Sequence, residues 1–282
     1  MATAVQPSKV DPSKISMTRM SENEDEKRRV LEIADRPEGR RQRARLAAAY
    51  RMIARAGMDD GVAGHISLRV PGAPDYFWVN HFGLFFNEIR ADNLVLVNKQ
   101  GEIVHNGRLI NYAGFCIHSA IHAARPDVNC ALHTHPPQGS AFSALHQLLR
   151  PLDQVGCSFF EDHALYSEYD GIIIDPKQAD GIVDALGDKR ALILANHGLL
   201  TAAGSVEQAV ADMLDLERTC GVNLRAMATG QPLHDVPTEF ARQARAVQTQ
   251  PGRWPFQWTA LIRDLRRHET DWDPYSWHDL AT

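Results

Sequence analysis

Two histidines at the end of an apolar segment constrain this chain more than any other feature. Apolar and small polar side chains alternate over residues 128–135, and two prolines follow directly, which predicts a strand that ends at His135. Side chains two apart project from one face of a strand, so His133 and His135 can converge on one metal ion. A second apolar run, residues 191–195, predicts a strand that stops at His197. We therefore expect a three-histidine metal site at the sheet edge where these strands end.

The composition predicts a cytoplasmic protein without a nucleic-acid or membrane partner. The 282 residues are 44% hydrophobic, and 30 basic against 35 acidic residues give a net charge of -5 without a long basic stripe. The four cysteines show no CxxC spacing, as in reduced cytosolic proteins. No apolar run reaches transmembrane length, and the first residues lack the hydrophobic core of a signal peptide.

The distribution of apolar residues predicts one domain with two appended segments. Residues 1–36 are polar and predict a flexible N-terminal arm, because so few apolar side chains cannot offset the entropy of ordering it. Residues 37–230 carry helix and strand patterns and predict a single metal-binding domain. Residues 231–282 form a tryptophan-rich C-terminal extension, which we expect to pack on a neighbouring subunit or over a pocket. An oligomer is therefore expected.

A polar cluster of Glu161, Asp162 and His163 is predicted to share the metal edge. Residues 156–163 begin with apolar and aromatic side chains, which predicts a strand that ends in this cluster. A carboxyl or imidazole group near a metal ion can transfer protons, so Glu161 and His163 are the predicted catalytic residues. A salt-bridge cluster between subunits is the alternative interpretation.

The helix predicted from Asn111 to Arg125 carries two more histidines, His118 and His122. Their spacing of four can chelate zinc on a helix. The residues between them lack the glutamate of the zinc-protease motif, which favours a core or ligand-supporting role.

Five motifs, in this order, resemble the class II aldolase/adducin family. They are Ala63-Gly-His-Ile-Ser, Ile117-His-Ser-Ala-Ile-His-Ala-Ala-Arg-Pro-Asp-Val, His133-Thr-His-Pro, Phe160-Glu-Asp-His-Ala and Asn196-His-Gly-Leu-Leu. The resemblance covers roughly residues 40 to 230. It implies a three-layer α/β/α fold with a mixed or mostly antiparallel sheet, one divalent metal ion on His133, His135 and His197, and a homo-tetramer.

The chain departs from the family's sugar-phosphate aldolases at four positions. Those enzymes use a glutamate just before the helix that leads to the paired histidines, and the matching residue here is Gly114. Two phosphate-holding serines are replaced by Tyr112 and Ala113, and the asparagine of the family's glycine-rich turn is His65. These replacements argue against a sugar-phosphate substrate.

The adducin-like branch of the family includes bacterial non-haem iron oxygenases of aminocoumarin antibiotic pathways, which this chain resembles in length, in its Gly-His-Ile-Ser turn and in the missing glutamate. The resemblance implies an Fe(II) enzyme that uses dioxygen to shorten an aromatic 2-oxo or 2-hydroxy acid, such as a prenylated hydroxyphenylpyruvate. We expect His65, Tyr112 and Phe82 to contact this substrate.

Two other functions stay open at this point. One is a Zn- or Mn-dependent aldolase or decarboxylase that recruits the Glu161 cluster for proton transfer. The other is a non-catalytic, adducin-like interaction module, against which the retained metal histidines argue.

Overall fold

The computed structural model describes residues 16–17, 19–169, 171, 173 and 176–273. Residues 1–15 of the predicted arm and Trp277 of the predicted extension lie outside the described residues. The main sheet contains β2 (His65–Val70), β3 (Ala73–Val79), β4 (Val95–Asn98), β5 (Ile103–His105), β7 (Cys130–Thr134), β8 (His163–Tyr166), β9 (Ala191–Leu194) and β10 (Gly198–Ala203). Two short strands, β1 (Ser16–Met17) and β6 (Ile110–Asn111), pair separately.

The strand order of the main sheet is β5-β4-β3-β2-β7-β10-β9-β8. Every neighbouring pair is antiparallel except β8 and β9, which run parallel. Because β7 and β9 both pair antiparallel with β10, they point the same way and end at the same edge of the sheet. The predicted mixed sheet is confirmed, and so is the common edge for the ends of these two strands.

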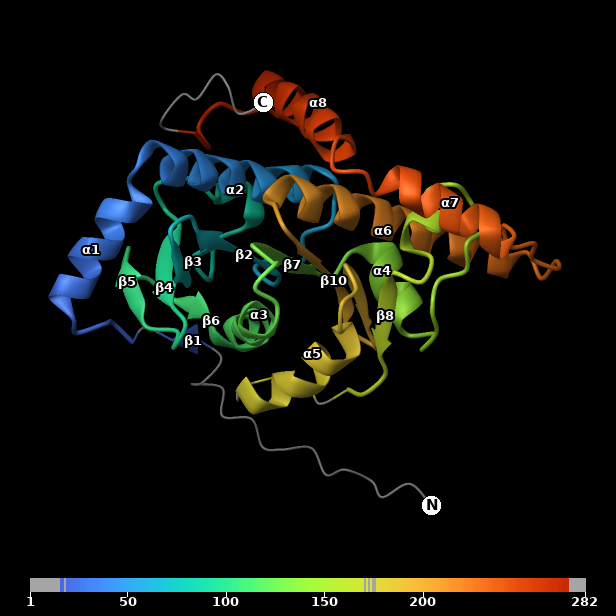
Figure 1. The fold of residues 1–282 in the computed structure, drawn as a ribbon, viewed down its shortest axis with the longest axis horizontal. Coiled ribbons are helices and arrows are strands. Elements are labelled where there is room, and N and C mark those ends of the chain that lie inside the picture. Colours follow the sequence, from blue (N-terminus) through green and yellow to red (C-terminus); the bar gives the residue numbers. More distant parts are fainter. Residues whose placement is uncertain (1–15, 18, 170, 172, 174–175, 274–282) are drawn as a thin grey trace, which may run out of the picture.

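Helices cover both faces of this sheet (Figure 1). One layer contains α2 (Pro37–Arg55), α6 (Val206–Ala228) and, outside them, α8 (Arg253–His268), while α3 (Tyr112–Ala124) and α5 (Asp180–Leu186) lie on the other face. The remaining helices are α1 (Glu24–Ala34), α4 (Pro137–Ser143), α7 (Thr238–Gln248) and the 3-10 turns η2 (Phe86–Glu88), η3 (Gly156–Phe159) and η4 (Pro176–Ala179). The predicted three-layer α/β/α fold is confirmed. None of the described helices is long and apolar enough to cross a membrane.

Helix α6 shows why the sequence folds in this way. Ser205 caps it, because its hydroxyl accepts a hydrogen bond from the backbone N–H of Gln208 at 3.2 Å. Val210, Met213 and Cys220 recur on one face of the helix and are fully buried in the main core. The four cysteines of the chain are all buried, and no disulfide joins them.

The strand predicted over residues 156–163 is wrong. Residues 156–159 form η3 instead, because the side chain of Asp153 accepts a hydrogen bond from Gly156 N at 2.7 Å and its carbonyl accepts from Cys157 N at 3.1 Å. Glu161 then adopts a positive φ of 58°, and β8 begins at His163. The polar cluster therefore precedes a strand and does not end one.

Both appended segments contain helices that pack on the domain. In the predicted arm, α1 is capped by Asn23 and buries Val30 and Ala34. In the predicted extension, Trp258 and Trp272 are buried in this chain's own core. The boundaries at residues 36 and 230 stay predictions.

Candidate metal centre

Three imidazoles meet at the sheet edge where β7 and β9 end. His133 is the fourth residue of β7, His135 follows that strand directly, and His197 lies in the turn between β9 and β10. One nitrogen of each ring lies within 4.8 Å of the other two, and the ring centroids are 4.7 to 4.9 Å apart. The structure thus brings the three predicted ligands together.

Hydrogen bonds behind two of the rings aim their free nitrogens at one point. His133 Nδ1 lies 2.8 Å from the Leu199 carbonyl, and His135 Nδ1 lies 3.1 Å from Asp60 Oδ2. Both partners are acceptors, so in the neutral ring each Nδ1 carries the hydrogen and each Nε2 carries a lone pair. The two Nε2 atoms are 3.0 Å apart. Two lone pairs at this distance repel unless a cation lies beside both, so this donor set fits a divalent metal ion.

Asp60 contacts one of the three histidines, and the sequence did not predict this contact. It belongs to the glycine-rich loop before β2, and its carboxylate fixes the orientation and tautomer of His135. The sequence offered only a weak signal, an acidic pair at Asp59 and Asp60 inside a loop next to the Gly-His-Ile-Ser turn.

Burial favours the neutral form of two of the three imidazoles, those of His133 and His197. It lowers the pKa of His133 well below its ordinary value, with repulsion between a protonated His133 and the neighbouring His197 as the next largest cause, and it lowers the pKa of His197 to about 4. A metal ion binds the unprotonated imidazole, so these two rings are ready to bind without losing a proton near pH 7.

A pocket of about 320 Å³ opens beside the three histidines. Of the predicted substrate contacts, His65 and Phe82 line it, whereas Tyr112 does not and stacks on Phe115 with ring centroids 6.2 Å apart. Apolar side chains form much of the remaining lining, and none of the described lining residues is a lysine or arginine. The described lining is Val62, Ala63, Gly64, His65, Phe82, Asn111, Ala113, Gly114, Ile117, His133, His135, Tyr169, Gly171, Ile173 and His197.

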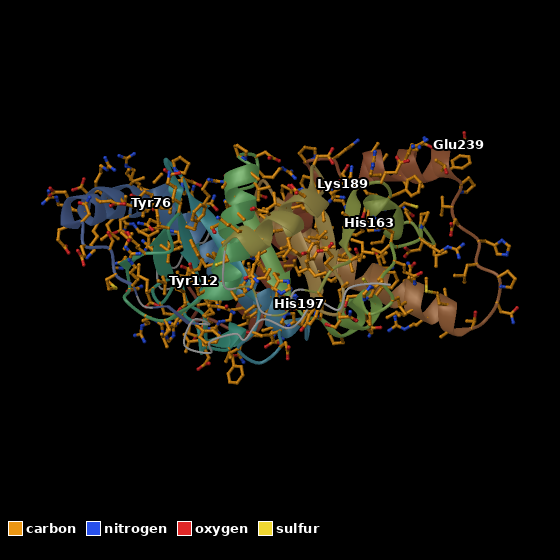
Figure 2. All side chains as sticks on the ribbon, turned by 90° about the horizontal axis from the view of Figure 1, so that it is seen from below. Tyr76, Tyr112, His163, Lys189, His197 and Glu239 are labelled. Atoms are coloured by element: carbon orange, nitrogen blue, oxygen red, sulfur yellow. The ribbon has the colours of Figure 1, made fainter. Side chains whose placement is uncertain are left out.

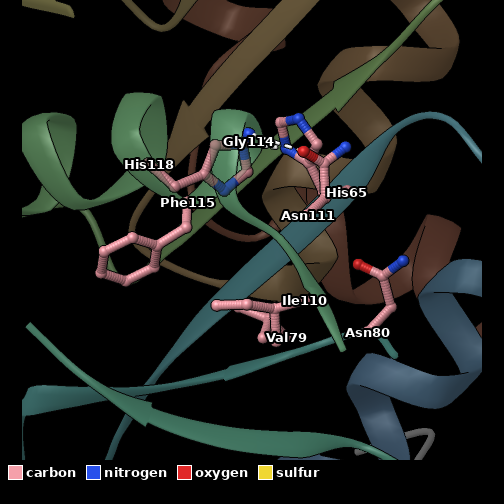
Figure 3. Close-up of a pocket in the computed structure, with 8 residues that line it drawn as sticks. All are labelled: His65, Val79, Asn80, Ile110, Asn111, Gly114, Phe115 and His118. Atoms are coloured by element: carbon pink, nitrogen blue, oxygen red, sulfur yellow. Dashed lines mark hydrogen bonds between the residues drawn. The ribbon is translucent and has the colours of Figure 1, made fainter. Parts of the chain in front are cut away.

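His65 occupies the space above Gly114, as Figure 3 shows. A Cβ atom added to Gly114 would lie 2.2 Å from His65 Cδ2 and 2.3 Å from Nε2, so no side chain fits at position 114 while the ring is there. The ring lies opposite His133 across the β2–β7 pair, with centroids 5.0 Å apart. An imidazole therefore fills the place next to the centre that the family resemblance assigns to the glutamate of sugar-phosphate aldolases.

Glu161 and His163 do not join this centre. In the parallel β8–β9 pair, His163 is level with Ala191, at the start of both strands, whereas His197 follows the end of β9 at Leu194. Three residues of strand, or about 10 Å, lie between those two levels. Both His163 and His197 are labelled in Figure 2.

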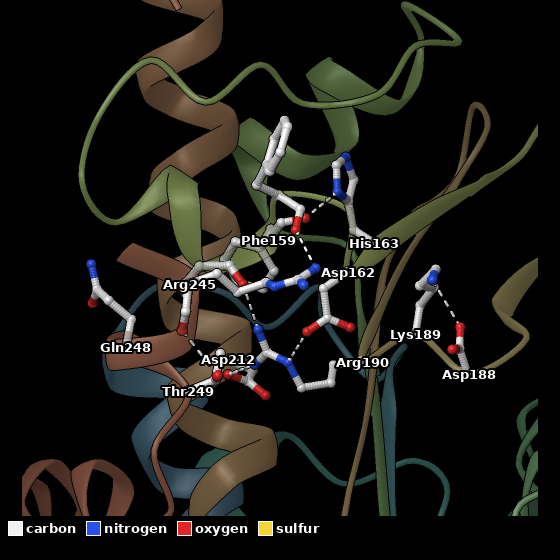
Figure 4. Close-up of polar contacts among 12 residues, drawn as sticks. Phe159, Asp162, His163, Asp188, Lys189, Arg190, Asp212, Arg245, Gln248 and Thr249 are labelled. Atoms are coloured by element: carbon white, nitrogen blue, oxygen red, sulfur yellow. Dashed lines mark hydrogen bonds and ion pairs between the residues drawn. The ribbon is translucent and has the colours of Figure 1, made fainter. Parts of the chain in front are cut away.

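The polar cluster is occupied by contacts within this chain. His163 Nδ1 donates to the Phe159 carbonyl at 2.7 Å, and its Nε2 accepts from Leu149 N at 2.9 Å. Glu161 forms an exposed ion pair with Arg242 at 2.5 Å. Arg190 bridges Asp162 and Asp212, at 2.6 Å from each (Figure 4). The catalytic role of Glu161 and His163 stays a prediction, and these contacts favour a structural role.

A three-layer α/β/α domain with three histidines at one sheet edge is the architecture of a metal-binding α/β protein. Residues 44–224 match the Class II Aldolase and Adducin N-terminal domain. The chain belongs to the class II aldolase and adducin family, as its motifs predicted.

Three similar proteins illustrate the range of this family. An aldolase II superfamily protein from Pseudomonas syringae has a TM-score of 0.79 and 42% identity, over 84% of this chain and 97% of that chain. An L-fuculose 1-phosphate aldolase from Glaciozyma antarctica PI12 has a TM-score of 0.75 and 35% identity, over 84% and 96%. A Streptomyces roseochromogenus subsp. oscitans protein named 4-hydroxy-3-prenylphenylpyruvate oxygenase/4-hydroxy-3-prenylbenzoate synthase is 38% identical over 200 residues, which are 70% of this chain and 72% of that protein.

Proposed function

We propose that this protein is a metal-dependent enzyme that breaks a carbon–carbon bond, and specifically a non-haem Fe(II) oxygenase that shortens an aromatic 2-oxo or 2-hydroxy acid. One observation carries the proposal: three imidazoles lie close enough together to hold one metal ion, while His65 fills the volume above Gly114 that an aldolase glutamate would need. Positioned proton transfer typically contributes about 100-fold to 10,000-fold to a rate, so an aldolase would lose much without this carboxylate.

The pocket suits an aromatic acid better than a sugar phosphate. Phe82, Ile117 and Ala113 offer apolar surface to a ring, and the described lining has no cationic side chain for a phosphate group. The relative named as an oxygenase acts, by its name, on a prenylated phenylpyruvate, which is an aromatic 2-oxo acid.

The side chains of this centre have assignable roles. The imidazoles of His133, His135 and His197 would hold the ion, and the Leu199 carbonyl and Asp60 keep two of them in the ligating tautomer. Bound Fe(II) would supply binding of the acid and activation of dioxygen. The apolar part of the lining would limit the access of water to the reacting atoms once a substrate is bound.

The overall reaction balances without another oxidant. An arylpyruvate and dioxygen give carbon dioxide and a 2-hydroxy acid that is one carbon shorter. One oxygen atom enters the new carboxylate and the other enters the new hydroxyl group.

Oxygen dependence tests the proposal. Protein loaded with Fe(II) should consume dioxygen with 4-hydroxyphenylpyruvate and release carbon dioxide, whereas zinc-loaded protein should not. His133→Ala should abolish both signals, and His234→Ala, which changes an exposed histidine, should preserve them. Undiminished product formation without oxygen, or with zinc, would overturn the oxygenase assignment.

An aldolase or decarboxylase with Zn or Mn is the second candidate. The L-fuculose 1-phosphate aldolase with 35% identity favours it. This candidate predicts oxygen-independent cleavage that zinc supports. A homo-tetramer, a cytoplasmic location and a role in antibiotic biosynthesis are also expected for the enzyme, and sedimentation velocity would test the first of these.

A further inference from the structure

A continuous row of buried hydrogen bonds leads from the pocket into the domain. His65 Nδ1 lies 2.8 Å from His118 Nε2, and His118 Nδ1 lies 2.7 Å from Ser67 Oγ. Ser67 Oγ lies 2.7 Å from His122 Nε2, and His122 Nδ1 lies 3.1 Å from the Val128 carbonyl. Residues two apart on β2 and four apart on α3 alternate along this row, because both pairs face the same interlayer space. We call it the histidine–serine row.

The inner end of the row determines the direction of every hydrogen bond in it. The Val128 carbonyl can only accept, so His122 Nδ1 carries a hydrogen. Burial lowers the pKa of His122 to about 3, so the ring is neutral and its Nε2 is an acceptor. Ser67 must then donate to His122 and accept from His118 Nδ1. His118 Nε2 is left as an acceptor, and His65 Nδ1 must donate to it.

Arg69 is the group near this end that favours the opposite direction. Its Nη2 lies 3.4 Å from His122 Nδ1, where it would meet a lone pair. The same Nη2 lies closer to the carbonyls of His122 and Val128, at 2.9 and 3.1 Å. A reversed row would also face the lone pair of Nδ1 against the Val128 carbonyl oxygen at 3.1 Å. The direction set by the carbonyl is therefore the stable one.

The outer end of the row is His65 Nε2. Among the described residues none forms a hydrogen bond with this atom, although His65 is only 8% exposed and lines the pocket. We propose that the histidine–serine row locks His65 in the Nδ1–H tautomer, so that Nε2 presents a lone pair to the pocket and selects a ligand that places a hydroxyl group there. An anionic oxygen of a phosphate or carboxylate at this point would meet the lone pair and be repelled.

Histidine tautomers are directly measurable. In zinc-loaded, diamagnetic full-length protein with ¹⁵N-labelled histidine, His65, His118 and His122 should each show a protonated Nδ1 and an unprotonated Nε2. Ser67→Ala should leave His122 in this tautomer, since the Val128 carbonyl holds it, and should mix the tautomers of His118 and His65. Ser119→Ala is the matched control. It removes a hydroxyl of α3 that donates to the Cys116 carbonyl and does not belong to the row. A protonated His65 Nε2 in the unmutated protein would overturn the lock.

The hydroxyl selection rests on the proposed function and has its own test. 4-Hydroxyphenyllactate should bind the zinc-loaded protein about tenfold more tightly than its 2-O-methyl ether, because the ether leaves a buried acceptor unpaired. Ser67→Ala should reduce this ratio, and Ser67→Thr, which keeps a hydroxyl, should restore it in part. Equal affinities would overturn the selection. A locked His65 in a protein that binds neither acid would overturn the assigned ligand and the proposed function, and leave the tautomer lock standing.

Discussion

Gly114 and His65 compete for one volume: a Cβ atom on the glycine would lie 2.3 Å from His65 Nε2, well inside van der Waals contact. The glycine therefore does more than tolerate the imidazole. Because position 114 is a glycine, the His65 ring has room beside the three clustered imidazoles of His133, His135 and His197.

Gly114→Ala tests this relationship. Alanine should stabilise a helix by up to about 1 kcal/mol, yet here we expect a loss of about 1–3 kcal/mol in unfolding free energy, because the ring must move. In a His65→Ala background the same substitution should become neutral or stabilising. Urea denaturation of the four proteins gives the coupling energy. Equal effects in both backgrounds would contradict the shared volume.

Metal content should follow the three histidines and Asp60. His133→Ala and His197→Ala should lose the ion, and Asp60→Asn should weaken metal affinity by about 10-fold to 100-fold, because His135 loses its orienting carboxylate. Competition with a chromophoric chelator measures this, with His234→Ala as control. Metal affinity unchanged in Asp60→Asn would exclude the orienting role.

Stability should fall in acid partly through His122. Its pKa is about 3 when folded, against an ordinary value of 6.5, so between these values the unfolded chain binds a proton that the folded chain does not. The stabilisation is complete above about pH 6.5 and is lost as pH falls toward 3, by up to about 1.4 kcal/mol per pH unit for this one group. His122→Gln should make the slope shallower. An identical slope in both proteins would count against this assignment.

Glu161→Gln and His163→Ala should differ from each other. Glu161 is exposed in its ion pair with Arg242, so turnover and unfolding should barely change. His163→Ala should destabilise the fold, because Leu149 N loses its buried acceptor, while kcat of the folded fraction stays the same. A large fall in kcat for either variant with an unchanged melting temperature would restore the catalytic role that the sequence predicts.

The clustering of His133, His135 and His197 was predictable because the evidence for it is local. Alternation over residues 128–135 and the apolar run before His197 each fix a strand and its end. The structure of residues 156–163 was not predictable in this way, since buried aromatic residues suit a 3-10 turn as well as a strand. The hydrogen bond from Gly156 N to the Asp153 side chain favours the turn. Periodicity does not register such a hydrogen bond.

Long-range partners lie beyond local patterns. Asp60 meets His135 across 75 positions of sequence, and the histidine–serine row exists only once β2 pairs with β7 under α3. Tyr112 precedes two pocket residues, yet its ring stacks on Phe115. The local sequence does not indicate this orientation of the side chain.

The position of the centre means that a bound ion would also stabilise the fold as a cross-link. His133 lies on β7, and His197 precedes β10, which pairs with β7 in the interior of the sheet. An ion bound by both His133 and His197 would cross-link the two ends of a segment of roughly 60 residues, as a disulfide does, but reversibly. The free energy of unfolding gained from this cross-link would rise with the free concentration of metal. At low metal concentration the pairing of β7 with β10 would then be less stable, and the stability of the fold would depend on the supply of metal.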